Sequence, residues 1–85
     1  MNLDEISQAL AELANCGDPV FAKAAEQVKQ QTQQTLMGQL SKEELCEILS
    51  DMQRQLDIIQ EMNQLAFKEK LNAVITGIIA IASAV

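Results

Sequence analysis

The sequence predicts an all-α protein with a single domain, and its composition and length are the main reasons. Hydrophobic residues make up 48% of the chain, mostly as Ala, Leu and Ile, and eleven further residues are Gln. This composition favours helices, whereas a β-sandwich relies on aromatic and β-branched side chains, and only Phe21 and Phe67 are aromatic. With 85 residues the chain forms one domain at most, which buries only about 60% of its unfolded surface.

The charge balance and the missing residue types exclude several kinds of function. Twelve acidic residues stand against six basic ones, so the net charge is −6 and the chain is poorly suited to neutralising nucleic-acid phosphates. His, Trp and Tyr are absent, and there is no Gly-rich phosphate loop, nucleophile motif or metal-ligand cluster. Carboxylate pairs such as Glu43 and Glu47 are typical of a solvated helix face. We therefore expect no enzyme, no catalytic residue, no metal and no cofactor.

The first helix is predicted over residues 3–15. Asn2 can cap it, and Glu5 follows three residues later, as in a capping box. The apolar residues recur at spacings of three and four, which places them on one face of the helix: Leu3, Ile6, Leu10 and Leu13. We expect this face to be buried against the rest of the chain.

The chain then turns and begins a second helix, predicted over residues 19–39. Gly17 can adopt the left-handed conformation that ends a helix, and Asp18-Pro19 supplies an N-cap followed by the first helical position. The second helix has a broken apolar stripe: Phe21, Ala25, Val28, Leu36 and Leu40. Its middle, VKQQTQQT, is polar all round and indicates either a solvated or frayed helix, or a hydrogen-bonding surface packed between subunits.

The third helix is predicted to run without a break over residues 42–85. Ser41 begins the sequence SKEE, a capping box in which Glu44 is the partner. No Pro follows, Gly77 is the only Gly, and a helix of this length would span about 66 Å. An apolar stripe runs along it: Leu45, Leu49, Met52, Leu56, Ile59, Asn63, Phe67, Leu71, Val74, Ile78, Ile81 and Val85.

Two irregularities interrupt this stripe. Its spacings alternate between three and four, except for three successive fours between Ile59 and Leu71, which act like a stutter that changes supercoiling. Asn63 is the only polar member, and a lone polar residue in an apolar seam often fixes the register of packed helices. We interpret both as features of one long helix that packs against other helices.

A stripe of this length is too long for the first two helices to cover, so it predicts an oligomer. The chain is expected to be an extended, hairpin-like subunit of a multi-subunit helical bundle, with the whole stripe at the oligomer interface. A second face of small residues would suit close helix packing: Ala73, Gly77, Ala80 and Ala84.

Residues 71–85 carry no charged side chain and raise the question of a membrane. Fifteen helical residues span about 22 Å, less than the hydrocarbon core of about 30 Å. We therefore favour a buried helix, and membrane association through this segment remains an alternative. The N-terminus lacks the basic region and apolar core of a signal peptide, so no cleavable export signal is expected.

The two cysteines, Cys16 and Cys46, form no Cys-x-x-Cys motif. They are expected to be small, buried and reduced side chains. One disulfide bond between them is possible on the sequence alone, but a single pair of cysteines does not make a disulfide framework.

The third segment, SKEELCEILSDMQRQLDIIQEMNQLAFKEKLNAVITGII, resembles the C-terminal helix of type III secretion needle and inner-rod proteins and of their flagellar basal-body rod relative. In those families a stretch rich in Leu and Gln precedes a long amphipathic helix. The opening MNLDEISQALAEL is similar to the short N-termini of needle proteins. The resemblance implies a helical homopolymer around a narrow export channel, secreted by its own apparatus without a signal peptide.

The sequence thus predicts a structural subunit that self-assembles through its long C-terminal helix into an oligomer or a helical filament. Its expected partners are other copies and other secretion-apparatus or virion proteins, without nucleic acid. The expected location is secreted, or within a cell-surface assembly. The alternatives are a small membrane-associated protein anchored by residues 71–85 and a small phage virion component or assembly chaperone, which would be membrane-associated or cytoplasmic.

Overall fold

The computed structural model describes residues 2–83 and contains four α-helices and one short 3-10 helix in that range. The all-α fold class with a long C-terminal helix is therefore confirmed. The elements are α1 (Leu3–Ala14), α2 (Pro19–Leu36), α3 (Lys42–Asp57), η1 (Met62–Gln64) and α4 (Leu65–Ser83).

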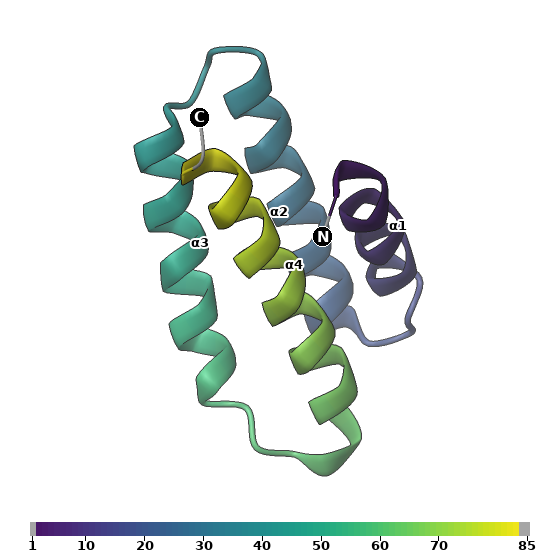
Figure 1. The fold of residues 1–85 in the computed structure, drawn as a ribbon. Helices are drawn as coiled ribbons and strands as arrows, with labels where there is room; N and C mark the ends of the chain where they lie inside the picture. Colours follow the sequence, from purple (N-terminus) through teal and green to yellow (C-terminus); the bar gives the residue numbers. More distant parts are fainter. Residues whose placement is uncertain (1, 84–85) are drawn as a thin grey trace.

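The helices form a bundle of 36 × 22 × 20 Å in which neighbours in sequence are neighbours in space (Figure 1). The longer helices α2, α3 and α4 run along the height of the molecule, and the shorter α1 lies at the right of the view. The α2–α3 turn is at the top, which we call the apical end, and the α3–α4 turn is at the bottom. Helices α2 and α4 each contact the other three α-helices, and α4 makes the more extensive contacts, so it is the centre of the packing.

The predicted start of each of the first three helices is confirmed by a capping hydrogen bond. Asn2 Oδ1 accepts from the backbone N–H of Glu5 at 2.8 Å in α1. Asp18 Oδ1 accepts from the N–H of Val20 at 2.9 Å in α2, where Pro19 is the first helical residue. Ser41 Oγ accepts from the Glu44 N–H at 3.1 Å in α3. These side chains satisfy backbone donors that have no partner within the helix.

Two glycines in the left-handed region allow the first two turns. Gly17 has φ = 85° between α1 and α2, and Gly38 has φ = 79° after α2. At Gly38 the N–H of Gln39 bonds to the carbonyl of Gln34, and the Gly38 N–H bonds to that of Thr35. This is a Schellman motif, and it ends α2 at Leu36, three residues before the predicted end at residue 39. The first helix likewise ends at Ala14, one residue before residue 15.

The prediction of one continuous helix over residues 42–85 is wrong. Helix α3 ends at Asp57, residues 58–61 are not helical, and the chain reverses through η1 into α4, which runs back beside α3 (Figure 1). The C-terminal half is therefore itself a hairpin, formed by α3 and α4. The molecule is 36 Å long, and the 66 Å helix does not form.

The sequence irregularities mark this turn. The three successive fours begin at Ile59, and Asn63 lies in η1, where it is exposed. The stutter is thus the point at which the stripe of one helix gives way to the stripe of another. Reversing the chain loses about four helical hydrogen bonds, each worth roughly 1 kcal/mol net. The reversal also buries six residues of the stripe, and burying each is worth about 1.5–3 kcal/mol. The free energy gained by burial therefore exceeds that lost with the hydrogen bonds.

Side-chain hydrogen bonds hold the turn in place. The Lys68 ammonium in α4 donates to the backbone carbonyl of Ile59 at 3.1 Å, so this carbonyl beyond the end of α3 has a partner. The Gln64 amide donates to Asp18 Oδ2 at 3.0 Å. Because Asp18 also caps α2, this bond ties the α3–α4 turn to the α1–α2 turn at the same end of the bundle.

The core fills the space between the four helices. Its largest fully buried side chains come from every α-helix: Phe21, Leu13, Leu49, Leu71, Ile75, Val28 and Val74. The Phe21 and Phe67 rings pack with centroids 5.8 Å apart, and a salt bridge joins Lys70 of α4 to Glu12 of α1. Exposed polar side chains also connect α3 to α4, since the Gln53 amide donates to the Thr76 hydroxyl at 2.9 Å.

Replacing Phe21 with Ala should remove a large part of the free energy of unfolding. Phe21 has no exposed surface, and Phe→Ala changes in cores cost about 3–5 kcal/mol, whereas 85 residues typically supply roughly 4–13 kcal/mol in total. The matched control is Val20→Ala, one residue away and 59% exposed, which should change stability by about 0.5 kcal/mol at most. Urea unfolding of both variants checks this, and similar losses would contradict the packing.

Asp18→Ala should destabilise the protein more at pH 7 than in strong acid. The hydrogen bond from Gln64 holds the pKa of Asp18 below its ordinary value of 3.8, helped by the backbone N–H groups of Val20 and Phe21. A depressed pKa in the folded state stabilises the fold above pH 3.8, and this contribution is lost as the pH falls through the folded-state pKa.

The measurement is thermal unfolding of wild type and Asp18→Ala between pH 7 and pH 2, with Glu69→Ala as an exposed acidic control on α4. The midpoint difference between wild type and Asp18→Ala should shrink in acid. A difference that is constant over the whole pH range would show that the carboxylate charge does not contribute.

Candidate interaction surface

Most of the residues predicted for an oligomer interface are used within the chain's own core. Six are buried, four are half-buried and Asn63 is exposed, while Val85 lies outside the described residues. The buried six are Leu45, Leu49, Leu56, Leu71, Val74 and Ile78, and the half-buried four are Met52, Ile59, Phe67 and Ile81. The reason for assigning this stripe to subunit contacts is therefore gone: the turn at residues 58–61 lets α3 and α4 cover each other.

The small residues predicted for close helix packing lie on the outside of α4. Ala73 and Ala80 are exposed and Gly77 is half-buried, while Ala84 lies outside the described residues. No charged side chain occurs between Leu71 and Ser83. Close packing of another helix on this face stays a prediction.

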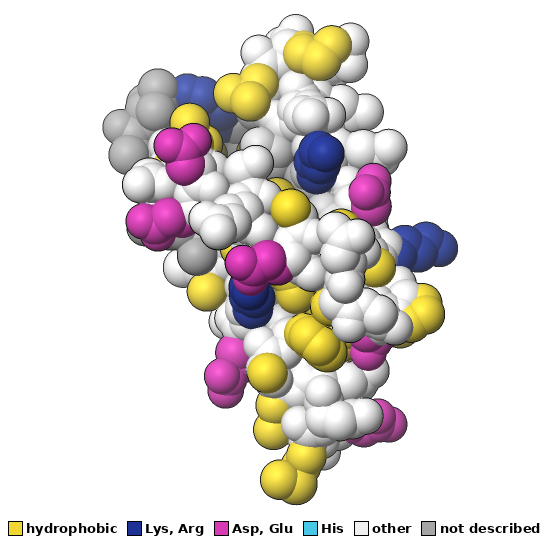
Figure 2. Space-filling view, turned by 90° about the vertical axis from the view of Figure 1, so that its right-hand side faces the viewer, with side chains coloured by type: hydrophobic (Ala, Val, Ile, Leu, Met, Phe, Trp, Pro, Cys, Tyr) yellow, Lys and Arg dark blue, Asp and Glu magenta, His cyan; other side chains and the backbone are white. Residues whose placement is uncertain are grey.

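Large hydrophobic side chains remain exposed at both ends of the bundle. Figure 2 shows hydrophobic side chains at the upper and lower tips of the molecule, and further ones between charged side chains along its middle. At the lower end Ile58 and Met62 are 77% and 87% exposed. At the upper end the exposed group is larger and consists of Leu36 and Met37 with Leu3.

The difference in length between α1 and α2 explains this upper group. Helix α2 has 18 residues and α1 has 12, so α2 is longer by about 9 Å at 1.5 Å per residue. Helix α1 ends and helix α2 begins at the same turn, and the last turns of α2 therefore extend past the beginning of α1. Leu36 lies there, and Met37 follows it.

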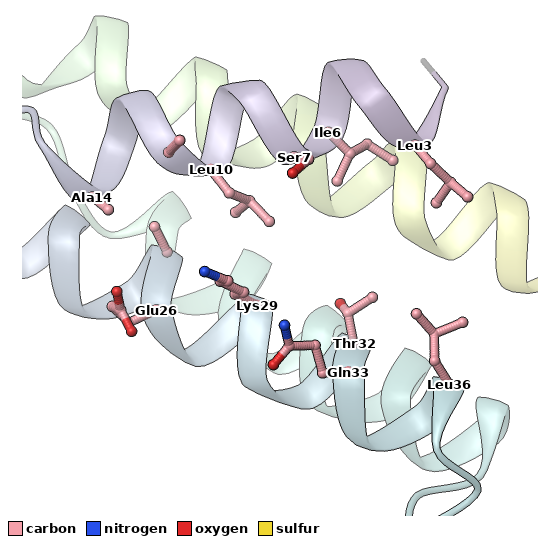
Figure 3. A pocket seen from close by; sticks show the side chains of 12 residues that line it. Leu3, Ile6, Ser7, Leu10, Ala14, Glu26, Lys29, Thr32, Gln33 and Leu36 are labelled. Atoms are coloured by element: carbon pink, nitrogen blue, oxygen red, sulfur yellow. The ribbon is translucent and has the colours of Figure 1, made fainter.

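A groove between α1 and α2 leads to this exposed group (Figure 3). It has a volume of about 260 Å³. Near the turn it is lined by the small side chains of Ala11, Ala14 and Ala25. At the other end the two helices diverge toward Leu3 and Leu36. Polar side chains also line it: Ser7, Glu26, Lys29, Thr32 and Gln33. We call this surface the α1–α2 groove.

A second hollow, the apical cavity, opens at the apical end of the bundle and shares Leu3, Ile6, Thr32 and Leu36 with the groove. It has a volume of about 240 Å³, and all four α-helices contribute to its walls. Its other lining residues are Thr35, Lys42, Leu45, Ile78, Ile81 and Ala82. The groove and the cavity are therefore two parts of one largely apolar hollow surface.

The polar middle of α2 is helical and has one buried and one solvated face. Val28 has no exposed surface, and the hydroxyls of Thr32 and Thr35 donate to the carbonyls four residues earlier. Four glutamines of this helix are exposed: Gln27, Gln30, Gln33 and Gln34. The helix is thus solvated but continuous, and contact of the glutamines with another subunit stays a prediction.

Other features of the described residues are weaker candidates for a functional site than the groove and the cavity. The thiols of Cys16 and Cys46 are free and half-buried. The depression beside Cys46 is lined by α3 alone, and its Arg54 is paired with Asp51 at 3.0 Å. Residues 2–83 contain no group of three His, Cys, Asp or Glu side chains that could hold a metal ion. No helix within that range is long and apolar enough to cross a membrane.

Comparison with known proteins finds no match to a family model, a curated protein or a solved structure. The resemblance to needle and inner-rod proteins therefore stays a prediction.

The sequence patterns did not reveal the hollow surface. Leu3 was expected on the buried face of the first helix and is 61% exposed, and Leu36 was expected in the stripe of the second helix and is 77% exposed. The available signal was the unequal length of the first two helices, 13 and 21 residues as predicted. That difference leaves the far end of the longer helix without a neighbour.

Proposed function

We propose that the chain is a small structural subunit that self-associates, with two copies packing through their α1–α2 grooves. The observation that carries this proposal is the shape of the groove, which has small residues at one end and protruding leucines at the other. A symmetric dimer places the same surface on both subunits, so the surface must complement itself. This groove has both the protrusions and the hollow that such a contact needs.

The arrangement of side chains supports a two-fold contact. A rotation about the middle of the groove, near Lys29, brings Leu3 and Leu36 of each copy over the small residues around Ala14 of the other (Figure 3). The two leucines are 61% and 77% exposed in one copy and become covered in the pair. Burying a leucine fully is worth about 1.5–3 kcal/mol, which makes these residues the main source of affinity.

Polar groups on the same helix support the same rotation. Glu26 and Gln33 lie on either side of Lys29, so the rotation brings the carboxylate of one copy near the amide of the other. Exposed Gln30 and Gln34 add amides that both donate and accept hydrogen bonds, and can therefore pair with themselves across a two-fold axis. The glutamine-rich sequence of α2 thereby fits a contact between copies.

The dimensions favour a side-by-side contact over an end-to-end one. A side of the molecule of 36 × 20 Å has an area of roughly 700 Å², close to the 800 Å² per partner of a standard stable interface. An end of 22 × 20 Å offers only about 400 Å². The groove runs along a side, and the smaller apolar tip at Ile58 and Met62 is better suited to a weak additional contact.

Electrostatic repulsion opposes association because each copy carries a net charge of −6. Near-physiological salt screens this repulsion, with a Debye length of about 8 Å at 0.15 M. Lys29 lines the groove and Lys42 lines the neighbouring cavity, so two of the six basic residues lie beside the contact. Self-association should therefore be measured at a salt concentration of about 0.15 M.

Leu36→Glu should abolish self-association. The change places a charge without a partner in the contact, which is expected to weaken dimerisation at least tenfold. Sedimentation velocity over a hundredfold concentration range measures it. The matched control is Val20→Glu, on the same helix but outside the groove, which should dimerise like wild type. A wild-type chain that stays monomeric throughout, or equal effects of the two variants, would contradict the proposal and leave the groove to a helix of another protein.

Disulfide trapping tests the register of the two copies. With the native cysteines replaced by Ser, a Leu36→Cys variant mixed with an Ala14→Cys variant should form a crosslinked heterodimer under mild oxidation. A disulfide requires Cβ atoms about 3.5–4.5 Å apart, so it reports the predicted apposition directly. Mixing Val20→Cys with Ala14→Cys is the control. Crosslinking that is no faster than in the control would contradict the two-fold arrangement.

A further inference from the structure

We propose that the apical cavity binds the alkyl chain of an aliphatic carboxylate, whose charged group is held by Lys42. The cavity is formed by a single copy of the chain, although it shares Leu3 and Leu36 with the surface that the proposed dimer covers. It concerns the end of the bundle where the four α-helices leave an opening into the core.

The walls of the cavity select an apolar occupant. Ile6, Leu45 and Ile78 are at most 5% exposed, yet all three line it, so the cavity reaches the core. Its two hydroxyl groups are already engaged: Thr32 donates to the Val28 carbonyl at 2.8 Å, and Thr35 donates to the Gln31 carbonyl at 3.1 Å. The inner wall therefore offers no free donor to a polar group, and an alkyl chain meets no unpaired partner there.

The volume sets the size of that chain. An apolar cavity of about 150 Å³ is large enough to bind benzene. The apical cavity has about 240 Å³, which corresponds to an alkyl chain of about eight carbons. Octanoate is therefore a suitable probe, and 1-octanol is the uncharged ligand of matching length.

The charge at the cavity selects the head group. Among the described residues of the lining, Lys42 is the only charged one. It is exposed, it is the first residue of α3, and it takes part in neither of the two salt bridges found among the described residues. The N-terminus of α3 adds a partial positive charge, which Glu43 and Glu44 in the same turn offset. An ammonium that has no ion-pair partner among residues 2–83 and lies beside an apolar hollow suits a singly charged carboxylate.

The test is a titration of the full chain with octanoate and with 1-octanol at pH 7, followed by methyl NMR of Ile78 and Ile81. Octanoate should bind at one saturable site, with the millimolar to micromolar affinity open to a ligand of about ten heavy atoms, and more tightly than 1-octanol. Lys42→Gln should weaken octanoate binding about threefold, the range of an exposed ion pair, and leave 1-octanol unchanged. Lys23→Gln, an exposed lysine elsewhere on α2, is the charge control.

A second pair of variants tests the location. Ala82→Trp fills the cavity and should weaken binding of both ligands more than tenfold, whereas Ala80→Trp, exposed on the same helix and outside the lining, should not. Circular dichroism establishes that both variants fold. The proposal is overturned by absence of saturable binding to wild type, by equal affinity for the two ligands, by a Lys23→Gln effect equal to that of Lys42→Gln, or by Ala80→Trp and Ala82→Trp behaving alike.

Discussion

The structure depends on the burial of α4 by the other three helices of the same chain. Leu71, Val74 and Ile75 have no exposed surface, although no charged residue follows Lys70 within the described chain. Such a segment is stable in water only if most of its surface is covered. The turn at residues 58–61 makes this cover available, because it returns the chain along α3 and past α1 and α2. Lys68 and Gln64 then fix the turn through their hydrogen bonds.

This constraint also explains what remains on the surface. Three helices of unequal length around α4 cannot all end at the same height, and the longer α2 extends beyond α1. The apolar group around Leu36 and the opening of the apical cavity follow from that mismatch. The candidate interaction surface is thus the end of the bundle at which the helices leave apolar side chains uncovered. Both proposals concern what covers these side chains.

The local signals in the sequence proved reliable. The caps at Asn2, Asp18 and Ser41 and the left-handed glycines depend on neighbouring residues only, so their chemistry can be read from short motifs. The stripe in the C-terminal half also identified residues that are buried. The choice of what buries them was wrong, because it depends on whether the chain reverses, and no Pro or Gly marks residues 58–61. The stutter and Asn63 carry that information, and the interpretation of both as features of a continuous helix is wrong.

The candidate surface was beyond such reasoning for a related reason. Whether Leu3 or Leu36 is covered depends on which helix lies opposite and where it ends, which is a property of the assembled bundle. The spacing of apolar residues gives the face of a helix but not the length of its neighbour. Leu3 and Leu36 are therefore 61% and 77% exposed, although their spacing predicts that both are buried.

The distance between residues 43 and 83 tests the central claim most directly. Both residues are exposed, and spin labels there, in a variant without the native cysteines and diluted with unlabelled protein, give an intramolecular distance by pulsed electron paramagnetic resonance. The reversal of the chain brings both ends to the apical cavity, which Lys42 and Ala82 line, so the distance should be well below the 36 Å length of the molecule. A continuous helix would separate the labels by about 60 Å. A distribution centred near that value would contradict the account.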